Sequence, residues 1–292
     1  MSLARIACVV PARDAADVIQ ATVGAARSLP GVDLVIVVDD NSSDPTGDYA
    51  AASGAIVVTH QRHRGRAGAI ESGVNALGVL EQRDKRPDCG TVLILDPDLG
   101  GSAAGAQALI GPVVTGRADL TIAVQPGMPV PSAEVGDTAG THPTARAGTD
   151  DPARGGDDSG SGGDATGAGG PDLAERTAAW GIRELTGWTP RAPLGTNRCL
   201  TRRAYELASP LAAGAGADVG MSVDLLRAGL RVSEVEVAFD SVRPTQDLSA
   251  QVQRARAVTE VSRALTTRGL LGSGLEEFRR SGVRGLLDKF RP

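Results

Sequence analysis

Two pairs of carboxylates follow apolar stretches of the chain. Asp39 and Asp40 end the run LVIVVDD, and Asp96 and Asp98 follow the run VLIL with one proline between them. Two carboxylates close together repel each other, and one takes up a proton unless a cation compensates the charge. Mg²⁺ and Mn²⁺ prefer carboxylate oxygens together with substrate phosphates. The pair Asp96 and Asp98 therefore predicts a divalent metal that holds a diphosphate.

Each acidic segment also has a simpler explanation. The stretch DDNSSDPTGD is rich in residues that favour turns and helix N-caps, and Ser102, after the second pair, could cap a helix. The first apolar run continues as PARDA. This matches neither of the glycine-rich phosphate-binding motifs GxGxxG and GxxxxGK[ST]. Both explanations stay open for each segment, although two acidic strand ends in one sheet favour a binding site.

The elements that would position these carboxylates alternate along the chain. Apolar runs of strand length occur at residues 5–10, 34–40, 55–60, 92–96, 118–124 and 231–239. Segments with helical spacing lie between them, and one of them places Ile70, Val74, Leu77 and Leu80 on a single face. This alternation is typical of an α/β fold with a mostly parallel sheet covered by helices on both faces. Ligands of such sheets bind beyond the carboxyl ends of the strands, where both acidic pairs are expected.

Composition excludes some classes of protein. The 292 residues carry a net charge of only -5 and 2% aromatic residues, which argues against a nucleic-acid partner. The three cysteines are scattered, which favours a reducing compartment over a disulfide framework. The apolar run near the N-terminus is too short for a signal peptide or a membrane span. We therefore expect a cytoplasmic protein.

Residues 126–171 interrupt the pattern. They are Gly, Ser, Thr, Asp and Pro with almost no large apolar side chain, so they cannot bury enough surface to offset their ordering entropy. We interpret them as a disordered acidic insertion within one domain that spans residues 1–267. Residues 268–292 form a helical tail rich in Leu and Arg, which either docks on the domain, as we favour, or makes a peripheral membrane contact.

A series of motifs occurs in a recognisable order: VVPARDAADVI, VIVVDDNSSDPT, RGRAGAIESGV, LILDPDLGG, NRCLTRRAYE and GADVGMSVDLLRAGLRVSEVEV. This series resembles family 2 glycosyltransferases of the GT-A fold, and most of all the polyprenol-phosphate sugar transferases and glucosyl-3-phosphoglycerate synthases. The resemblance implies a transferase that uses a nucleotide-diphospho-sugar, with a Mg²⁺ or Mn²⁺ ion that stabilises the leaving diphosphate. Its acceptor would offer a hydroxyl or a phosphate, and a polyprenyl phosphate and a small phosphorylated acid are both open. A homodimer is open as well.

The resemblance also implies roles for individual residues. The donor would be bound by Pro11, Arg13, Asp39, Asp40, Arg64, Gly65, Arg66 and Asp96. Among these, Asp39 and Asp40 would contact the base and ribose, and positive charge near the diphosphate would favour the leaving group. Asp98 would be the direct metal ligand and Asp218 the base that deprotonates the acceptor. The alternatives are a helix N-cap for Asp218 and solvated charges for the two arginines.

Several positions depart from the family pattern. Asp14 and Ala15 stand where the family has Asn-Glu, and Val242 stands where close relatives have a histidine that helps to hold the metal. Valine cannot bind a metal, so a third protein ligand is missing unless Asp240 replaces it. These departures motivate a second hypothesis, a degenerate GT-A protein that binds a nucleotide or a partner without catalysis. A sugar nucleotidyltransferase is disfavoured, because PARDA supplies no glycine-rich loop.

Two pairs of rarer residues allow alternative roles. Trp180 and Trp188 are candidates for stacking on a sugar and are equally plausible as core residues. His60 and His63 flank the basic segment HRGRAG, and a hydrogen-bonded structural role is the more frequent one for such histidines.

Overall fold

The structure is a computed structural model that describes residues 5–128, 173–240 and 248–270. The predicted insertion, apart from residues 126–128, lies outside the described residues, as do Val242 and the tail beyond Leu270. Within the described part of the chain, no helix is long and apolar enough to cross a membrane.

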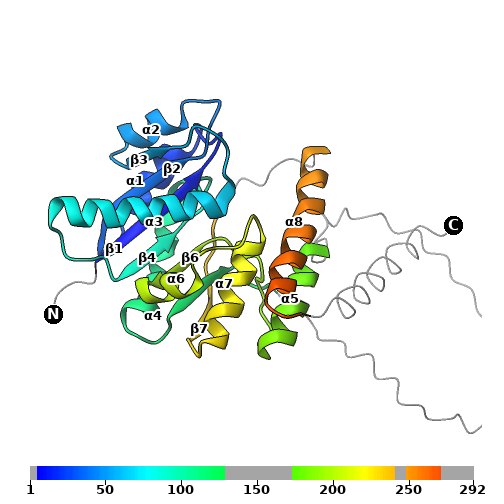
Figure 1. Cartoon of the computed structure of the whole chain (residues 1–292). Coiled ribbons are helices and arrows are strands. Elements are labelled where there is room, and N and C mark those ends of the chain that lie inside the picture. Colours follow the sequence, from blue (N-terminus) through cyan, green and yellow to red (C-terminus); the bar gives the residue numbers. More distant parts are fainter. Residues whose placement is uncertain (1–4, 129–172, 241–247, 271–292) are drawn as a thin grey trace, which may run out of the picture.

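One seven-stranded sheet organises the protein, in the order β3-β2-β1-β4-β6-β5-β7 (Figure 1). Only β6 runs antiparallel to its neighbours, and all other pairs are parallel, which confirms the predicted mostly parallel α/β fold. Six strands lie within or close to predicted ones, whereas β6 was not predicted. The strands are β1 Ile6–Ala12, β2 Val32–Asp39, β3 Ile56–Thr59, β4 Thr91–Ile94, β5 Leu120–Val124, β6 Arg198–Thr201 and β7 Val232–Glu236.

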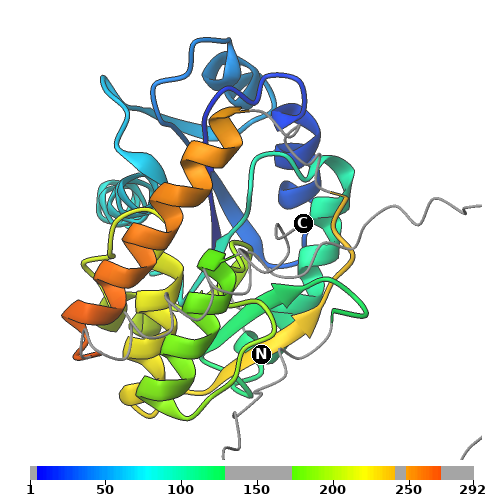
Figure 2. The same ribbon diagram turned by 90° about the vertical axis from the view of Figure 1, so that its right-hand side faces the viewer.

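Helices cover both faces of this sheet (Figures 1 and 2). The 3₁₀ helix η1 and helices α1 and α4 pack on one face, and α3, α6 and α7 pack on the other. Helices α5, α7 and α8 contact one another and form a further cluster beside the sheet. The helices are α1 Ile19–Arg27, α2 Thr46–Ala52, α3 Gly65–Asp84, η1 Gly100–Ala106, α4 Gln107–Val114, α5 Leu173–Thr186, α6 Arg202–Ala208, α7 Gly216–Arg227 and α8 Leu248–Thr267.

Helix α3 lies close against the sheet and fixes the start of the basic segment. The predicted apolar face of this helix is confirmed, because all four of its residues are buried. Gly73 allows the close approach, since a Cβ atom at this position would lie 2.5 Å from Cγ1 of Val9 in β1. The first residue of α3, Gly65, lies beside the end of β2, because its N–H donates to Asp40, which follows that strand.

The two tryptophans belong to the helical cluster. Trp180 and Trp188 pack against buried apolar residues of α5, α7 and α8, such as Val223 and Leu265. The structure therefore favours the core alternative for both tryptophans.

Candidate functional site

The carboxylate of Asp40 holds the segment between β3 and α3. Asp40 is 4% exposed. Its Oδ1 accepts hydrogen bonds from His60 Nδ1 at 2.7 Å and from the backbone N–H of Arg64 at 2.8 Å, and its Oδ2 accepts one from the N–H of Gly65 at 2.7 Å. His63 Nδ1 lies 2.7 Å from the same Oδ2. Burial alone would raise the pKa of Asp40, but these bonds and the charge of His63 outweigh it and hold that pKa below its usual value.

A contact between Asp40 and a nucleotide would have to replace one of these bonds, so the predicted contact with base or ribose stays a prediction.

His60, which binds Asp40, is held by hydrogen bonds on both sides of its ring. His60 is buried, and its second ring nitrogen, Nε2, lies 2.9 Å from Oγ of Ser72 on α3. Arg64 is exposed and donates from Nη1 to the same hydroxyl at 2.9 Å. These contacts support the hydrogen-bonded role for His60.

The other predicted donor-side residues lie at the ends of β1 and β2. Pro11 is buried in β1, and the exposed Arg13 follows at the end of the strand, with its Nε 3.4 Å from a carboxylate oxygen of Asp14. Asp39 is buried at the end of β2, where its Oδ1 accepts a hydrogen bond from the N–H of Ser42 at 2.9 Å. The structure therefore brings these residues together at the carboxyl ends of β1 and β2.

The family's Asn-Glu position has a structural function in this chain. Asp14 adopts a positive φ of 49°, and its Oδ1 accepts a hydrogen bond from the N–H of Ser43 at 2.7 Å. The hydrogen bonds from Ser43 lower the pKa of Asp14. The N–H of Ala15 donates to Oγ1 of Thr46 at 2.8 Å. Residues 14–15 thus tie the loop after β1 to the loop after β2.

Asp96 is fully engaged by protein groups. Its Oδ1 accepts a hydrogen bond from Arg66 Nη1 at 2.7 Å, and its Oδ2 accepts from the hydroxyl of Thr196 and from Nδ2 of Asn197 at 3.2 Å. The Asp96 N–H in turn donates to Oδ1 of Asn197 at 2.8 Å. The negative charge of Asp96 is therefore compensated by Arg66 and by the segment that precedes β6.

Asp98 differs from its neighbour in the pair. It is partly buried, and no other described residue donates a hydrogen bond to its carboxylate. Burial raises the pKa of Asp98, and the negative charge of Asp96 raises it further, while its own backbone N–H and the charge of Arg66 oppose this. Asp98 is therefore the carboxylate of the pair that is available to a cation.

The donor set fits a divalent cation that is held largely by a ligand. Among the described residues, no group of three or more His, Cys, Asp or Glu side chains could hold a metal. A cation would compensate the negative charge of the partly buried Asp98 carboxylate. Diphosphate oxygens and water would complete the coordination of Mg²⁺. The exposed Asp240 donates its backbone N–H to Ser102 Oγ at 3.0 Å. Ser102 is not a helix cap, because it lies inside η1, whose N-cap is Leu99.

Arg66 lies between the carboxylates of Asp96 and Asp218. In addition to its bond with Asp96, its Nε lies 3.9 Å from Oδ2 of Asp218. Asp218 is 4% exposed in the first turn of α7, and Nε of the fully buried Arg198 lies 3.2 Å from its Oδ1. The N-cap of α7 is Ala215, which excludes the N-cap alternative for Asp218. Burial raises the pKa of Asp218 although both arginines lower it.

Arg66, Asp218 and Arg198 form a row of alternating charges, in which two arginine N–H groups have no hydrogen-bond partner. Arg198 gives one nitrogen to the carbonyl oxygen of Asp218 at 3.0 Å and to Oγ of Ser222 at 3.2 Å. Nη2 of Arg198 and Nε of Arg66 are buried and have no hydrogen-bond partner. Both N–H groups belong to arginines that flank Asp218, so the positive charge of this row exceeds what its hydrogen bonds use.

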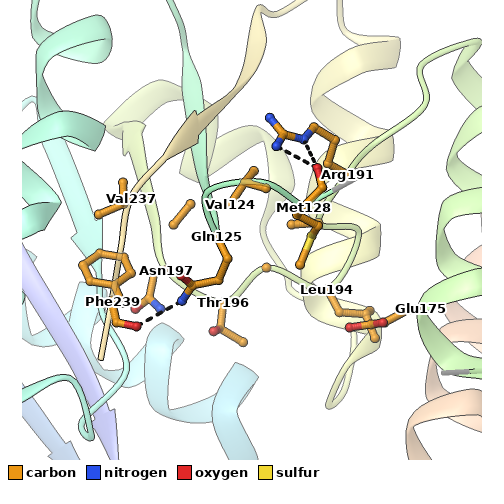
Figure 3. Close-up of a pocket in the computed structure, with 13 residues that line it drawn as sticks. Val124, Gln125, Met128, Glu175, Arg191, Leu194, Thr196, Asn197, Val237 and Phe239 are labelled. Atoms are coloured by element: carbon orange, nitrogen blue, oxygen red, sulfur yellow. Dashed lines mark hydrogen bonds between the residues drawn. The ribbon is translucent and has the colours of Figure 1, made fainter. Parts of the chain in front are cut away.

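A pocket of about 170 Å³ lies at the end of β5, next to residues that bind Asp96 (Figure 3 shows its lining). Thr196 and Asn197, which bind Asp96, form part of its wall. The remaining lining comes from the end of β5, the start of α5, the loop before β6 and the chain after β7. These residues are Ala123, Val124, Gln125, Met128, Glu175, Arg191, Ala192, Leu194, Gly195, Val237 and Phe239.

Sequence analysis assigned no function to Thr196, Asn197 or Arg198. The motif NRCLTRRAYE was recognised as part of the family series, but its short polar start gave no signal of a strand. Only the antiparallel pairing of β6 with β4 shows that the residues before β6 face the end of β4.

Comparison with known proteins agrees with this fold. Residues 7–78 match the family described as Glycosyl transferase family 2. The fold also matches solved structures of a glucosyl-3-phosphoglycerate synthase, and together with the family match this confirms the predicted resemblance to family 2 glycosyltransferases of the GT-A fold. No curated protein matches the chain in sequence.

The structural matches include glucosyl-3-phosphoglycerate synthase from Mycobacterium tuberculosis. Its complex with phosphoglyceric acid is 21% identical with a TM-score of 0.62, over 90% of this chain and 79% of that chain. Its complex with Mn²⁺, uridine diphosphate (UDP) and phosphoglyceric acid is 20% identical with a TM-score of 0.62, over 92% and 80%. A further complex contains Mn²⁺, UDP-glucose and phosphoglyceric acid, at 20% identity and a TM-score of 0.59, over 90% and 80%.

Proposed function

We propose that the protein transfers a sugar from a nucleoside-diphosphate sugar to an acceptor hydroxyl. The observation that carries this proposal is the position of Arg66, between Asp96 and Asp218 at the carboxyl edge of the sheet. The Arg66 side chain is 20% exposed, so its guanidinium could bind the diphosphate of a donor at these strand ends and stabilise it as it leaves. The match to family 2 glycosyltransferases supports the same function.

The transfer forms one bond and breaks another at the anomeric carbon of the donor sugar. The acceptor oxygen bonds to this carbon, and the bond from the carbon to the diphosphate oxygen breaks, with its electron pair leaving on the nucleoside diphosphate. The acceptor hydroxyl loses its proton to a base or to the departing phosphate. A divalent metal would be held by Asp98 together with the diphosphate, and it would supply positive charge to the leaving group.

The chain's own residues would then bind and orient the donor. The nucleoside would lie over the ends of β1 and β2, beside Pro11, Arg13 and Asp39, and Asp40 would hold the segment that carries Arg64 and Gly65. The N–H groups of Arg64 and Gly65, at the N-terminus of α3, already bind the carboxylate of Asp40, which is the anion that this helix end favours.

For Asp218 we propose a positioning role through Arg66. A base role would require an acceptor hydroxyl to reach a carboxylate that is 4% exposed and flanked by two arginines. Asp218→Asn separates the two roles, because loss of a base lowers kcat at unchanged UDP affinity. Loss of positioning weakens UDP binding and raises KM for the donor.

The test of donor binding is calorimetric titration of UDP, GDP and their sugars in the presence of Mn²⁺. We expect one of these nucleotides to bind, and Asp98→Ala to weaken its binding. Asp88→Ala is the matched control, since Asp88 is exposed and makes no contact within the described part of the structure. If no nucleotide binds and Asp98→Ala is indistinguishable from the parent, the proposal is wrong.

A second candidate is a protein that binds the nucleotide without catalysis. It is favoured by the complete engagement of Asp96, which leaves Asp98 as the available carboxylate of the pair. The doubly substituted Asp96→Asn, Asp98→Asn protein is the reference for this test. Donor hydrolysis or transfer by the parent above that reference would reject the second candidate.

A further inference from the structure

Asn197 binds Asp96 through both ends of its side-chain amide. Its Oδ1 accepts a hydrogen bond from the backbone N–H of Asp96 at 2.8 Å, and its Nδ2 donates to Oδ2 of the same residue at 3.2 Å. Asn197 is 9% exposed, so water competes little for these bonds. The first bond fixes which end of the amide carries the oxygen, and the other end therefore presents N–H groups to the carboxylate. A reversed amide would place two donors against each other.

The segment that carries Asn197 is held against β5. The N–H of Ala123 donates to the carbonyl oxygen of Asn197 at 2.9 Å. Two residues earlier, a Cβ atom at Gly195 would lie 2.6 Å from a side-chain carbon of β5, so a glycine allows this close approach. Nε of the fully buried Arg198 donates to the carbonyl oxygen of Gly195 at 2.6 Å. The amide of Asn197 is therefore presented from a backbone that is fixed on both sides.

The carboxylate that Asn197 binds is also a partner of Arg66. Nη1 of Arg66 donates to Oδ1 of Asp96 at 2.7 Å, and Nη2 donates to the carbonyl oxygen of Thr196. The Thr196 hydroxyl donates to Oδ2 of Asp96, the same oxygen that Asn197 binds. One oxygen of Asp96 thus faces the segment before β6, and the other faces the guanidinium. If this carboxylate turned, the guanidinium would lose its charged partner.

We propose that Asn197 is a positioning residue of the donor site. It fixes the orientation of Asp96, which in turn holds Arg66 where it binds the diphosphate of the donor. A guanidinium that is already in place needs no further ordering when the ligand binds, and this favours affinity. The inference rests on the proposed function, because the position of Arg66 matters for binding only if a diphosphate is its ligand.

Two single substitutions disturb this pair in opposite ways. Asn197→Asp keeps the size of the side chain and the oxygen that binds the Asp96 N–H. It replaces the Nδ2 donor by an oxygen and places a second carboxylate beside Asp96, and two carboxylates repel each other. The Asp96 side chain should then turn and release Arg66. In Asp96→Asn, the new NH₂ group must face either Nδ2 of Asn197 or Nη1 of Arg66, and both of these are donors.

The double substitution Asp96→Asn, Asn197→Asp exchanges the amide and the carboxylate within the pair. The amide at position 96 can then donate to the carboxylate at position 197 and turn its oxygen toward Nη1 of Arg66. The Thr196 hydroxyl can accept as well as donate, and the net charge of the pair is unchanged. If Asn197 acts through Asp96, the exchange should restore part of what each single substitution removes, whereas independent effects would add.

The test is calorimetric titration of the full chain in the presence of Mn²⁺. The ligands are UDP or GDP, whichever binds the parent protein, and the corresponding nucleoside. We expect each single substitution to weaken binding of the diphosphate about tenfold or more, a difference of about 1.4 kcal/mol. The double substitution should bind it more tightly than either single one. Binding of the nucleoside, which lacks the diphosphate, should be unchanged in all three variants. Asn75→Asp, at an exposed position on α3, is the matched control and should change neither affinity.

The possible failures are distinguishable. The inference is overturned, and the proposed function survives, if Asn197→Asp binds the diphosphate as tightly as Asn75→Asp does. It is overturned in the same way if the losses of the two single substitutions add in the double one, or if nucleoside binding falls together with diphosphate binding. If Asn197→Asp does not fold, the comparison of the double substitution with Asp96→Asn decides. If no nucleotide binds the parent protein, the proposed function fails and the inference fails with it.

Discussion

Substitution of Asp40 by asparagine should destabilise the protein and weaken donor binding together. The side chain keeps its size, but one of its two oxygens becomes an NH₂ group. Each oxygen of Asp40 faces two donors, among them the N–H groups of Arg64 and Gly65. Asparagine can therefore keep one pair of contacts and must place a donor against the other pair.

The magnitude follows from the two lost bonds. A hydrogen bond to a charged group contributes about 1.5–3 kcal/mol, so loss of two at this buried position lowers the free energy of unfolding by about 3 kcal/mol or more. For a domain of this size 1 kcal/mol shifts Tm by about 2–4 °C, which predicts a decrease of about 6–12 °C. UDP binding should weaken as well, since the segment that carries Arg64 and Arg66 loses its anchor.

The pH dependence gives this prediction a second signature. The pKa of Asp40 is held below its ordinary value, so its stabilising contribution is fully present above the unfolded pKa, about 4 for an aspartate. That contribution is lost as the pH falls through the lower pKa of the folded state. The difference in Tm between Asp40→Asn and the parent should therefore be constant near neutral pH and become smaller below about pH 4.

Thermal unfolding followed by circular dichroism measures these effects, with Asp88→Asn as the control for loss of one exposed carboxylate. A Tm for Asp40→Asn no lower than that of the control would refute the anchoring role. An unchanged UDP affinity in a destabilised variant would refute the link between the anchor and the donor site.

Three further substitutions test other parts of the structure. Asp98→Asn removes a half-buried charge without a protein partner, so Tm should stay the same or rise while Mn²⁺ no longer strengthens UDP binding in calorimetry. Arg198→Met leaves the buried carboxylate of Asp218 with only the more distant Arg66, at 3.9 Å. It should lower the free energy of unfolding by about 3 kcal/mol in denaturant titrations, and a neutral effect would contradict the buried ion pair. Gly73→Ala should destabilise by about 1–3 kcal/mol through its contact with Val9. Gly24→Ala, in open space on α1, should instead stabilise by about 0.5–1 kcal/mol, and equal effects of the two would exclude the packing explanation.

The sheet and its main helices could be predicted because their signals are local. Apolar runs mark β1, β2 and β4, and spacing within one segment predicts the buried face of α3. The strand β6 carried no such signal, since it has four residues and begins with an arginine. Arg198 is buried because Asp218, on a helix that follows in the chain, compensates its charge. This compensation exists only after the chain has folded.

The sequence indicated which residues lie near one another in the candidate site. It indicated their individual contacts less well. Asp39, Asp96 and Arg66 lie at one edge of the sheet, as the strand ends indicated. The partners of Asp96 could not be predicted, because Thr196 and Asn197 are about a hundred residues away in sequence and reach it through antiparallel pairing. The same holds for the pocket, whose wall comes from four separate segments.

The antiparallel strand β6 has a consequence for the order of events during turnover. Residues 195–197 form the wall of the pocket on one side and bind Asp96 on the other. Any ligand that moves this short segment changes the hydrogen bonds of Asp96, and with them the position of Arg66. If a donor binds at Arg66, as proposed, and an acceptor binds on the pocket side, we expect their binding to be linked through this segment, and linkage is reciprocal. A filled donor side should change acceptor affinity by the same factor by which a bound acceptor changes the affinity for UDP.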